Sequence, residues 1–274
     1  MDFENVLNRI SYHVIYDYSI IAALEFAASN GFSGIQIAMD SLHLGFEDLS
    51  DKEVEVIKIG SEALNVCINL HAPDGASLVY PYGRTDRGIM SYYSDLIEFA
   101  KKIGAKIITI HPGVPAHFPT DTEPSQLFAE QDIELYKQIF KSNLDKLLEL
   151  ADGKVQICIE NVNLQPFVIE TLEEYVKSTA LGLCWDFEKM HNRNHSINTE
   201  VREFFFRNLA AVKQVHLHNI TNGKSHRVIQ PGLIDFKYYL GLLKDFDVLD
   251  YCIEVRPREK AVESLENLRK ILSK

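Results

Sequence analysis

Six short apolar segments of this sequence each end in a histidine, an aspartate or a glutamate. These residues are His71, His111, Glu160, Asp186, His216 and Glu254. Carboxylate oxygens and imidazole nitrogens are common ligands of divalent metals, and carboxylates also exchange protons in catalysis. Three carboxylates gathered in one cavity would repel one another and raise their own pKa values unless a cation neutralised them. We therefore predict a metal site built from the three carboxylates and His216.

The ligand types restrict the identity of the metal. Three oxygen donors and one imidazole form a hard ligand set, which suits Mn2+, Mg2+, Co2+ or Zn2+ rather than copper(I). His71 and His111 add nitrogen ligands, so we expect a second ion that shares Glu160. One carboxylate at a strand end is often only a helix cap. Six such ends on one predicted rim are difficult to explain as independent events.

The elements that position these residues alternate along the whole chain. Short runs rich in Val, Ile and Leu are typical of strands buried on both faces. We expect such strands at residues 10–15, 34–39, 66–70, 106–110, 155–159, 182–185, 214–217 and 251–255. Apolar residues at helical spacing predict helices at residues 19–29, 52–64, 90–103, 131–151, 172–178, 201–209, 236–243 and 261–272. Strand and helix therefore alternate eight times.

Eight such units without a linker rich in Pro, Gly or Ser predict a single (β/α)8 TIM barrel domain over residues 1–274. The alternative is an open, doubly wound sheet, which binds ligands at its switch point. A barrel instead brings the carboxyl ends of all its strands to one face. The polar strand ends favour the barrel, because only a closed ring lets them share an ion.

The four cysteines provide a check on side-chain direction, since residues two or four apart in a strand share a face. Cys67 precedes His71 by four residues, and the other three cysteines each precede a candidate carboxylate by two; they are Cys158, Cys184 and Cys252. All four should therefore be reduced, apolar fillers of the barrel interior. No CxxC pair indicates a disulfide scaffold or a cysteine-rich zinc site.

Composition disfavours two classes of partner. The formal charge of −11 and the absence of a basic run make nucleic acid a disfavoured partner. No apolar stretch reaches the roughly 18 residues of a membrane span, and the first ten residues do not resemble a signal peptide. We expect a cytoplasmic protein without a membrane partner, and the sequence leaves homo-oligomer formation open.

Over nearly its whole length the chain resembles the xylose isomerase-like barrel superfamily, which includes tagatose 3-epimerases, inosose dehydratases, hydroxypyruvate isomerases and endonuclease IV. The matching residues are His71 in NLHAP, His111 in TIHPG, Glu160 in CIENV, Asp186 in CWDFEKMH, His216 in VHLHN, His226 before QPGLIDF, and Glu254 in CIEVRP. The epimerase branch implies a sugar or sugar-phosphate substrate and one Mn2+- or Mg2+-like ion on the four predicted ligands. It also implies that Glu160 and Glu254 exchange protons with substrate carbon through an enediolate.

Two alternatives to an isomerase or epimerase stay open. Resemblance to endonuclease IV implies a zinc phosphodiesterase that uses all six strand-end residues. Its third zinc is opposed here, because Lys224 stands where that family has an aspartate, and because its Asp-x-x-His is stretched to Asp186 and His191. A barrel that binds a small molecule without catalysis is the other alternative. Dehydration is not separated from isomerisation, since both begin with proton abstraction beside a carbonyl.

Further residues are candidates for contact with substrate. We assign His191, His226 and His13 to substrate binding, and Arg256 to a phosphate or a sugar hydroxyl. His218 shares the parity of His216, and its role is left open. Residues 80–84 and 112–124 form loops on the active face that could act as lids. His43, His117 and His195 are expected on the solvated surface.

Overall fold

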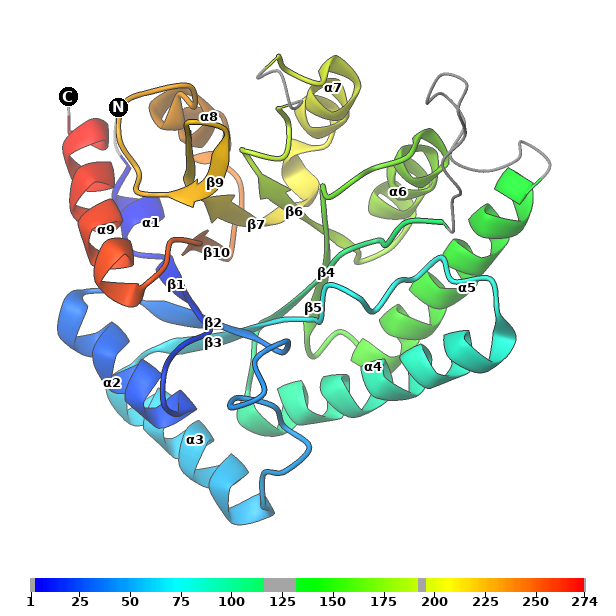
Figure 1. Ribbon diagram of the computed structural model, residues 1–274, viewed down its shortest axis with the longest axis horizontal. Coiled ribbons are helices and arrows are strands. Elements are labelled where there is room, and N and C mark those ends of the chain that lie inside the picture. Colours follow the sequence, from blue (N-terminus) through cyan, green and yellow to red (C-terminus); the bar gives the residue numbers. More distant parts are fainter. Residues whose placement is uncertain (1–2, 116–131, 192–195, 274) are drawn as a thin grey trace.

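The structure is a computed structural model that describes residues 3–115, 132–191 and 196–273. In these ranges eight parallel strands close into a barrel in the order β1-β10-β7-β6-β5-β4-β3-β2, with helices around it (Figure 1). The predicted (β/α)8 barrel is confirmed, and an open doubly wound sheet is excluded. The barrel strands are β1 (Ile10–Val14), β2 (Gly34–Ala38), β3 (Cys67–His71), β4 (Ile107–Ile110), β5 (Gln156–Glu160), β6 (Gly182–Asp186), β7 (Val212–Leu217) and β10 (Asp250–Ile253).

The helices pack their apolar faces on the outside of this barrel. They are α1 (Glu4–Leu7), α2 (Ile20–Asn30), α3 (Asp51–Leu64), α4 (Gly83–Ile103), α5 (Ile133–Ala151), α6 (Pro166–Ser178), α7 (Thr199–Arg207), α8 (Phe236–Leu243) and α9 (Arg258–Leu272), with a 3-10 turn η2 (Leu209–Ala211). None of the helices in the described ranges is both long and apolar enough to cross a membrane.

Two helices begin at least six residues earlier than their apolar spacing predicts. Helix α4 starts at residue 83 rather than 90. The prediction missed its first two turns because they are mainly exposed and carry no apolar stripe. Helix α6 starts at residue 166 rather than 172, with Pro166 in its first turn. Proline suits that position because its fixed φ is helical and the missing N–H would have no partner within the helix.

A small antiparallel hairpin follows β7 and was not predicted. It consists of β8 (Asn219–Thr221) and β9 (Lys224–Arg227), joined by Asn222 and Gly223, which both have positive φ. An Asn-Gly pair is the preferred sequence of such two-residue turns, so the signal was present in the sequence. The hairpin brings His226 back over the end of β7.

The cysteine prediction is confirmed at three positions and wrong at the fourth. Cys158, Cys184 and Cys252 are fully buried. Cys67 is exposed, since it is the first residue of β3 and lines a cavity at the opposite mouth of the barrel, together with Arg9. Its parity is as expected, but no further layer of side chains covers it.

A chain of polar side chains fills the barrel interior below His216. Gln36 Nε2 lies 3.1 Å from His216 Nε2 and 3.1 Å from Gln214 Oε1, which also accepts a hydrogen bond from Thr109. Gln214 Nε2 in turn donates to Asp250 Oδ2 at 2.8 Å. Barrel interiors are usually filled by branched aliphatic residues, so this polar chain is a departure that connects the strand ends with the lower barrel.

Burial raises the pKa of Asp250 from about 3.8 to about 6. The folded protein thus holds this proton more tightly than the unfolded chain does. Its stabilising contribution is complete below pH 3.8 and is lost as the pH rises through 6. We expect Asp250→Asn to raise the Tm of the metal-free protein, relative to wild type, by a few degrees more at pH 8 than at pH 4.5. About 2–4 °C corresponds to each kcal/mol.

Thermal melts of both proteins at the two pH values measure this difference. Asp245→Asn is the matched control, since Asp245 is exposed and lies a few residues before the same strand. A Tm difference that is the same at both pH values would contradict the assignment.

Candidate metal centre and active site

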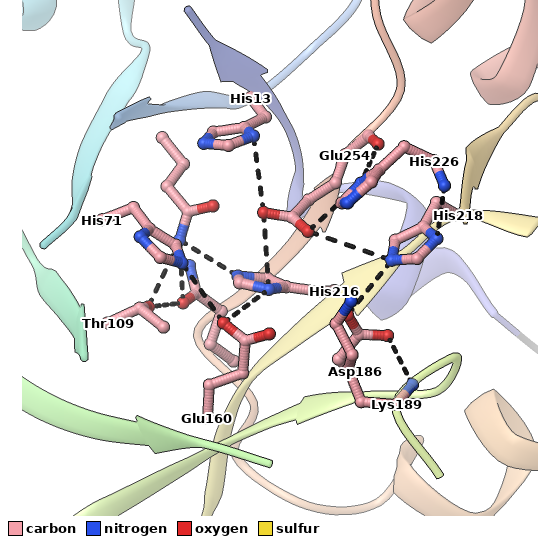
Figure 2. A network of polar contacts seen from close by, with 12 residues as sticks. His13, His71, Thr109, Glu160, Asp186, Lys189, His216, His218, His226 and Glu254 are labelled. Carbon is pink, nitrogen blue, oxygen red and sulfur yellow. Dashed lines mark hydrogen bonds and ion pairs between the residues drawn. The ribbon is translucent and has the colours of Figure 1, made fainter. Parts of the chain in front are cut away.

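The polar strand ends meet in a cavity of about 490 Å³ at the carboxyl face of the barrel. Figure 2 shows the side chains pointing toward one another from different strands. The predicted residues that line the cavity are His13, His71, His111, Glu160, His226, Glu254 and Arg256. Asp186 and His216 are fully buried. Residues up to 243 positions apart in sequence therefore converge at one face, as a closed barrel requires.

Glu160, the last residue of β5, is the most densely coordinated group. Its Oε2 atom lies 3.1 Å from His111 Nε2, 3.2 Å from His71 Nε2 and 3.3 Å from His216 Nδ1. Burial disfavours ionisation of the carboxyl, but the surrounding imidazoles, His216 foremost, hold its pKa well below the usual range. Glu160 is therefore an anion facing three nitrogen ligands.

Glu254 follows β10 and faces His216 from the other side. Its Oε1 atom lies 3.5 Å from His216 Nδ1 and 3.4 Å from His13 Nδ1. Burial disfavours both charges, yet the two carboxylates raise the pKa of His216 to about 10, while His216 keeps the pKa of Glu254 below its usual range. His216 thus lies buried between two carboxylates, which favour a proton on its Nδ1.

This donor set fits a divalent cation. His216 Nδ1 is buried without a hydrogen-bond partner of good geometry, although two carboxylates are close to it. The proton on this nitrogen occupies the position in which a metal would neutralise both anions. Ligand atoms lie within 4.8 Å of one another in His71–His216–Glu254 and in His71–His111–Glu160, so the geometry also brings together the predicted second group.

Asp186 is adjacent but turned away from this cluster. Its Oδ1 atom accepts from the backbone amides of Glu188 and Lys189, and its Oδ2 lies 3.1 Å from His218 Nε2. Asp186 groups with Glu188 and His218 rather than with His216. The four predicted ligands therefore do not form one group in this conformation, because His218 pairs with the fourth.

His218 and His226 form a second histidine pair beside Glu254. Their rings stack at 4.3 Å, and His218 Nδ1 accepts the backbone N–H of His226. His218 Nε2 therefore carries a proton that it donates to Asp186. His226 Nδ1 lies 3.0 Å from the Glu254 carbonyl oxygen. The structure thus brings His218, whose role the sequence left open, into the site.

Other expectations differ in outcome. His191 is not among the cavity-lining residues, because its Nδ1 faces the Glu188 carbonyl and its backbone pairs with Ile197. Lys189 lines the cavity instead. Its position three residues after Asp186 is the sequence feature from which this could have been predicted. His43 is exposed as predicted. His117, His195 and residues 116–124 of the second loop lie outside the described residues.

The aromatic loop does not line this cavity either. Tyr80 and Tyr82 pack on each other with ring centroids 5.6 Å apart, and Tyr82 is exposed. Arg84 lies in the first turn of α4. Residues 80–84, which were predicted to form a lid, therefore do not line the cavity in this conformation.

Sequence reasoning also missed Gln36, which supports the metal centre from below. Gln36 is the polar residue in the apolar run of β2, and it is fully buried. Its side chain is the neighbour of His216 Nε2, the nitrogen on the far side of the ring from the carboxylates. A metal on Nδ1 leaves the ring proton on Nε2, so the Gln36 amide would turn its oxygen, which has no partner in the structure, toward that N–H and fix the orientation of the ring.

Comparison with known proteins gives one family for the chain. The family model described as xylose isomerase-like TIM barrel matches residues 24–271. An uncharacterized protein of Methanocaldococcus jannaschii is 28% identical over 199 residues, which are 70% of this chain and 67% of that protein.

Many solved structures share the fold, including the following two. A D-tagatose 3-epimerase-like protein has a TM-score of 0.70 at 22% identity, with 97% of each chain covered. Endonuclease IV from Thermus thermophilus has a TM-score of 0.66 at 21% identity, covering 97% of this chain and 98% of that one. At these identities the likeness extends to the fold alone.

We expect Gln36→Leu to weaken metal binding by about 10- to 100-fold, since it removes the hydrogen-bonding partner of His216 Nε2. Competition with a fluorescent chelator measures the Kd. Gln138→Leu, at an exposed position of α5, is the matched control. Equal Kd values for both variants and wild type would exclude a positioning role for Gln36.

Proposed function

Because this chain belongs to the xylose isomerase-like TIM barrel family, we propose that it is a metal-dependent sugar or sugar-phosphate isomerase or epimerase. The observation that carries the proposal is the pair of buried carboxylates, Glu160 and Glu254, on either side of His216 Nδ1. Two ionised carboxylates across one cavity can remove a proton from a substrate carbon and return it to another face or another carbon.

The residues that would hold the ion are Glu160, His216 and Glu254, with Asp186 as the fourth ligand after rotation away from His218. A divalent ion such as Mn2+, Mg2+, Co2+ or Zn2+ would polarise the substrate carbonyl and so acidify the neighbouring C–H. His71 and His111 would hold a second ion that shares Glu160.

Proton transfer would then be performed by the two glutamates. Glu160 ends β5 and Glu254 follows β10, two strands separated in the barrel by β6 and β7. A substrate between them presents opposite faces to the two carboxylates. One glutamate abstracts the proton to give an enediolate. The same glutamate then returns it to the neighbouring carbon in an isomerisation, whereas in an epimerisation the other glutamate, after taking a proton from solvent, delivers it to the opposite face and the first releases its proton to solvent. Low pKa values keep the abstracting glutamate in its anionic form.

Phosphodiester cleavage of the endonuclease IV type is the second candidate. The His71–His111–Glu160 group favours it, since a one-metal epimerase site does not require these histidines. Lys189 opposes it, because Asp186 and Glu188 outweigh burial and raise the pKa of Lys189, so a cation already lines the cavity that would have to hold several zinc ions. The net charge of −11 also opposes binding to DNA.

Elemental analysis of the purified protein, followed by a screen of sugars and sugar phosphates, tests the proposal. One or two Mn2+-like ions per chain and turnover of a sugar would support it. Two or three zinc ions with cleavage of abasic DNA would favour the second candidate. If no ion binds even after reconstitution, the catalytic proposal fails and a non-catalytic binding protein remains.

We expect Glu254→Gln to keep the fold and lower kcat by about 10²–10⁴-fold, because it removes a proton-transfer group at almost unchanged size. Initial rates at saturating metal measure the effect, and circular dichroism checks the fold. Glu263→Gln, at an exposed position of α9, should retain full activity. Near-normal turnover by the Glu254 variant would remove this residue from the mechanism.

We expect Asp186→Asn to weaken metal binding at least about tenfold, since one ligand charge is lost. Equilibrium dialysis against the metal measures the Kd. Asp152→Asn, an exposed helix cap, is the control. An unchanged Kd would show that Asp186 remains paired with His218 in the holoprotein.

A further inference from the structure

A second cavity, of about 330 Å³, adjoins the first. His13, Ile15 and Arg256 line both, so these residues form the seam between the two cavities. The outer wall includes Tyr16 and Tyr18, whose side chains are largely exposed. A molecule longer than the first cavity could therefore continue into the second without leaving the barrel face.

Arg256 has free hydrogen-bonding capacity at this seam. Its Nε atom is buried without a partner, and the guanidinium forms no ion pair with a carboxylate in the described part of the chain. An Nη atom of the same group contacts His13 Nδ1 at 3.1 Å. A buried, unpaired guanidinium N–H is costly unless an acceptor reaches it, so the geometry indicates a missing acceptor.

His13 presents a second such donor. Because a guanidinium can only donate, His13 Nδ1 is the acceptor of this contact and the proton of the ring is on Nε2. That Nε2 atom is also buried without a partner, and the residue is only 7% exposed. Two unpartnered N–H groups, one of them on a cation, thus belong to two seam residues that are in contact with each other.

The N-terminus of α9 forms another wall of the second cavity. The helix has 15 residues, begins at Arg258 after Pro257, and has no side-chain cap. Its first-turn backbone amides and its dipole favour an anion there. Two carboxylates also line this wall, and both pair with Arg258: Asp17 Oδ1 lies 2.7 Å from its Nη1 and Glu259 Oε1 lies 3.5 Å from its Nε, so one guanidinium offsets part of their combined charge.

We propose that the second cavity is an anion subsite, in which Arg256 Nε, His13 Nε2 and the amides at the start of α9 bind a phosphate ester or carboxylate of the substrate. This inference rests on the proposed function for the rest of the substrate, whose reacting carbons would lie over Glu160 and Glu254. His13 Nδ1 is 3.4 Å from Glu254 Oε1, so the subsite adjoins the proton-transfer group. The substrate class is therefore a phosphorylated or carboxylated sugar rather than a neutral one.

Calorimetric titration of the full-length protein with inorganic phosphate, and separately with acetate, tests the subsite without any assumption about turnover. The titrations are run on the metal-loaded protein and after chelation, since phosphate could also bind the metal. We expect Arg256→Gln to weaken binding of the preferred anion about 10- to 100-fold with or without metal. Arg256→Lys, which keeps the charge but loses the fork of donors, should fall between.

Arg207→Gln is the matched control, because it removes the same charge from an exposed pair with Glu173. Stronger binding of phosphate than acetate identifies a sugar phosphate, and the reverse identifies a sugar acid. Equal affinities for wild type, Arg256→Gln and Arg207→Gln overturn the subsite, as does anion binding that requires the metal. Thermal melts confirm that the variants are folded.

The sugar screen separates failure of the subsite from failure of the proposed function. If anion binding depends on Arg256 but no sugar is converted, the subsite stands and the isomerase assignment falls. If neutral sugars are converted with a KM that Arg256→Gln leaves unchanged, the reverse holds.

Discussion

The site depends on one contact: a single oxygen of Glu160 lies within 3.3 Å of nitrogens from three histidines. An isolated carboxylate that is 2% exposed would be strongly destabilising. The three imidazoles offset this cost, and they come from β3, from the end of β4 and from β7. Only a closed barrel brings those strand ends around one point. The charge of Glu160 and the closure of the sheet therefore require each other.

A chain of hydrogen bonds connects the site with the lower part of the barrel interior. Gln36 orients His216, Gln214 orients Gln36, and the chain ends at Asp250, whose carboxyl is held at the edge of ionisation by burial. A barrel filled with branched aliphatic residues would pack as well, but it would leave His216 Nε2 without a partner. Hydrogen-bond satisfaction, rather than packing alone, therefore determines which residues fit this interior.

The barrel and most of its polar rim could be predicted from the sequence, because strand parity and parallel strand direction alone place residues such as His71 and Glu160 at one face. The pairing of Asp186 with His218 could not be predicted from the sequence. It depends on the rotamers of both side chains and on the β8–β9 hairpin, whose His226 N–H binds His218. The sequence predicted that His191 contacts the substrate, but Lys189 lines the cavity instead. The loop after β6 has no periodic pattern from which the direction of these side chains could be predicted. Cys67 lies on the strand face that its parity predicts. The sequence does not show that it lies at the open end of the barrel, where it is exposed.

The pairing of β1 with β10 joins the first strand of the barrel to the last. His13 comes from one, while Glu254 and Arg256 follow the other, so both cavities are built across this junction. A partly opened ring, in which β10 has separated from β1, would keep Glu254 beside His216, because β10 also pairs with β7, but it would break the contacts of His13 with Glu254 and Arg256. A ligand that contacts both sides therefore binds only the closed ring and stabilises it by mass action. Binding of a ligand at the site thus stabilises the pairing of β1 with β10. Amide hydrogen exchange along these two strands should be slower in the ligand-bound protein.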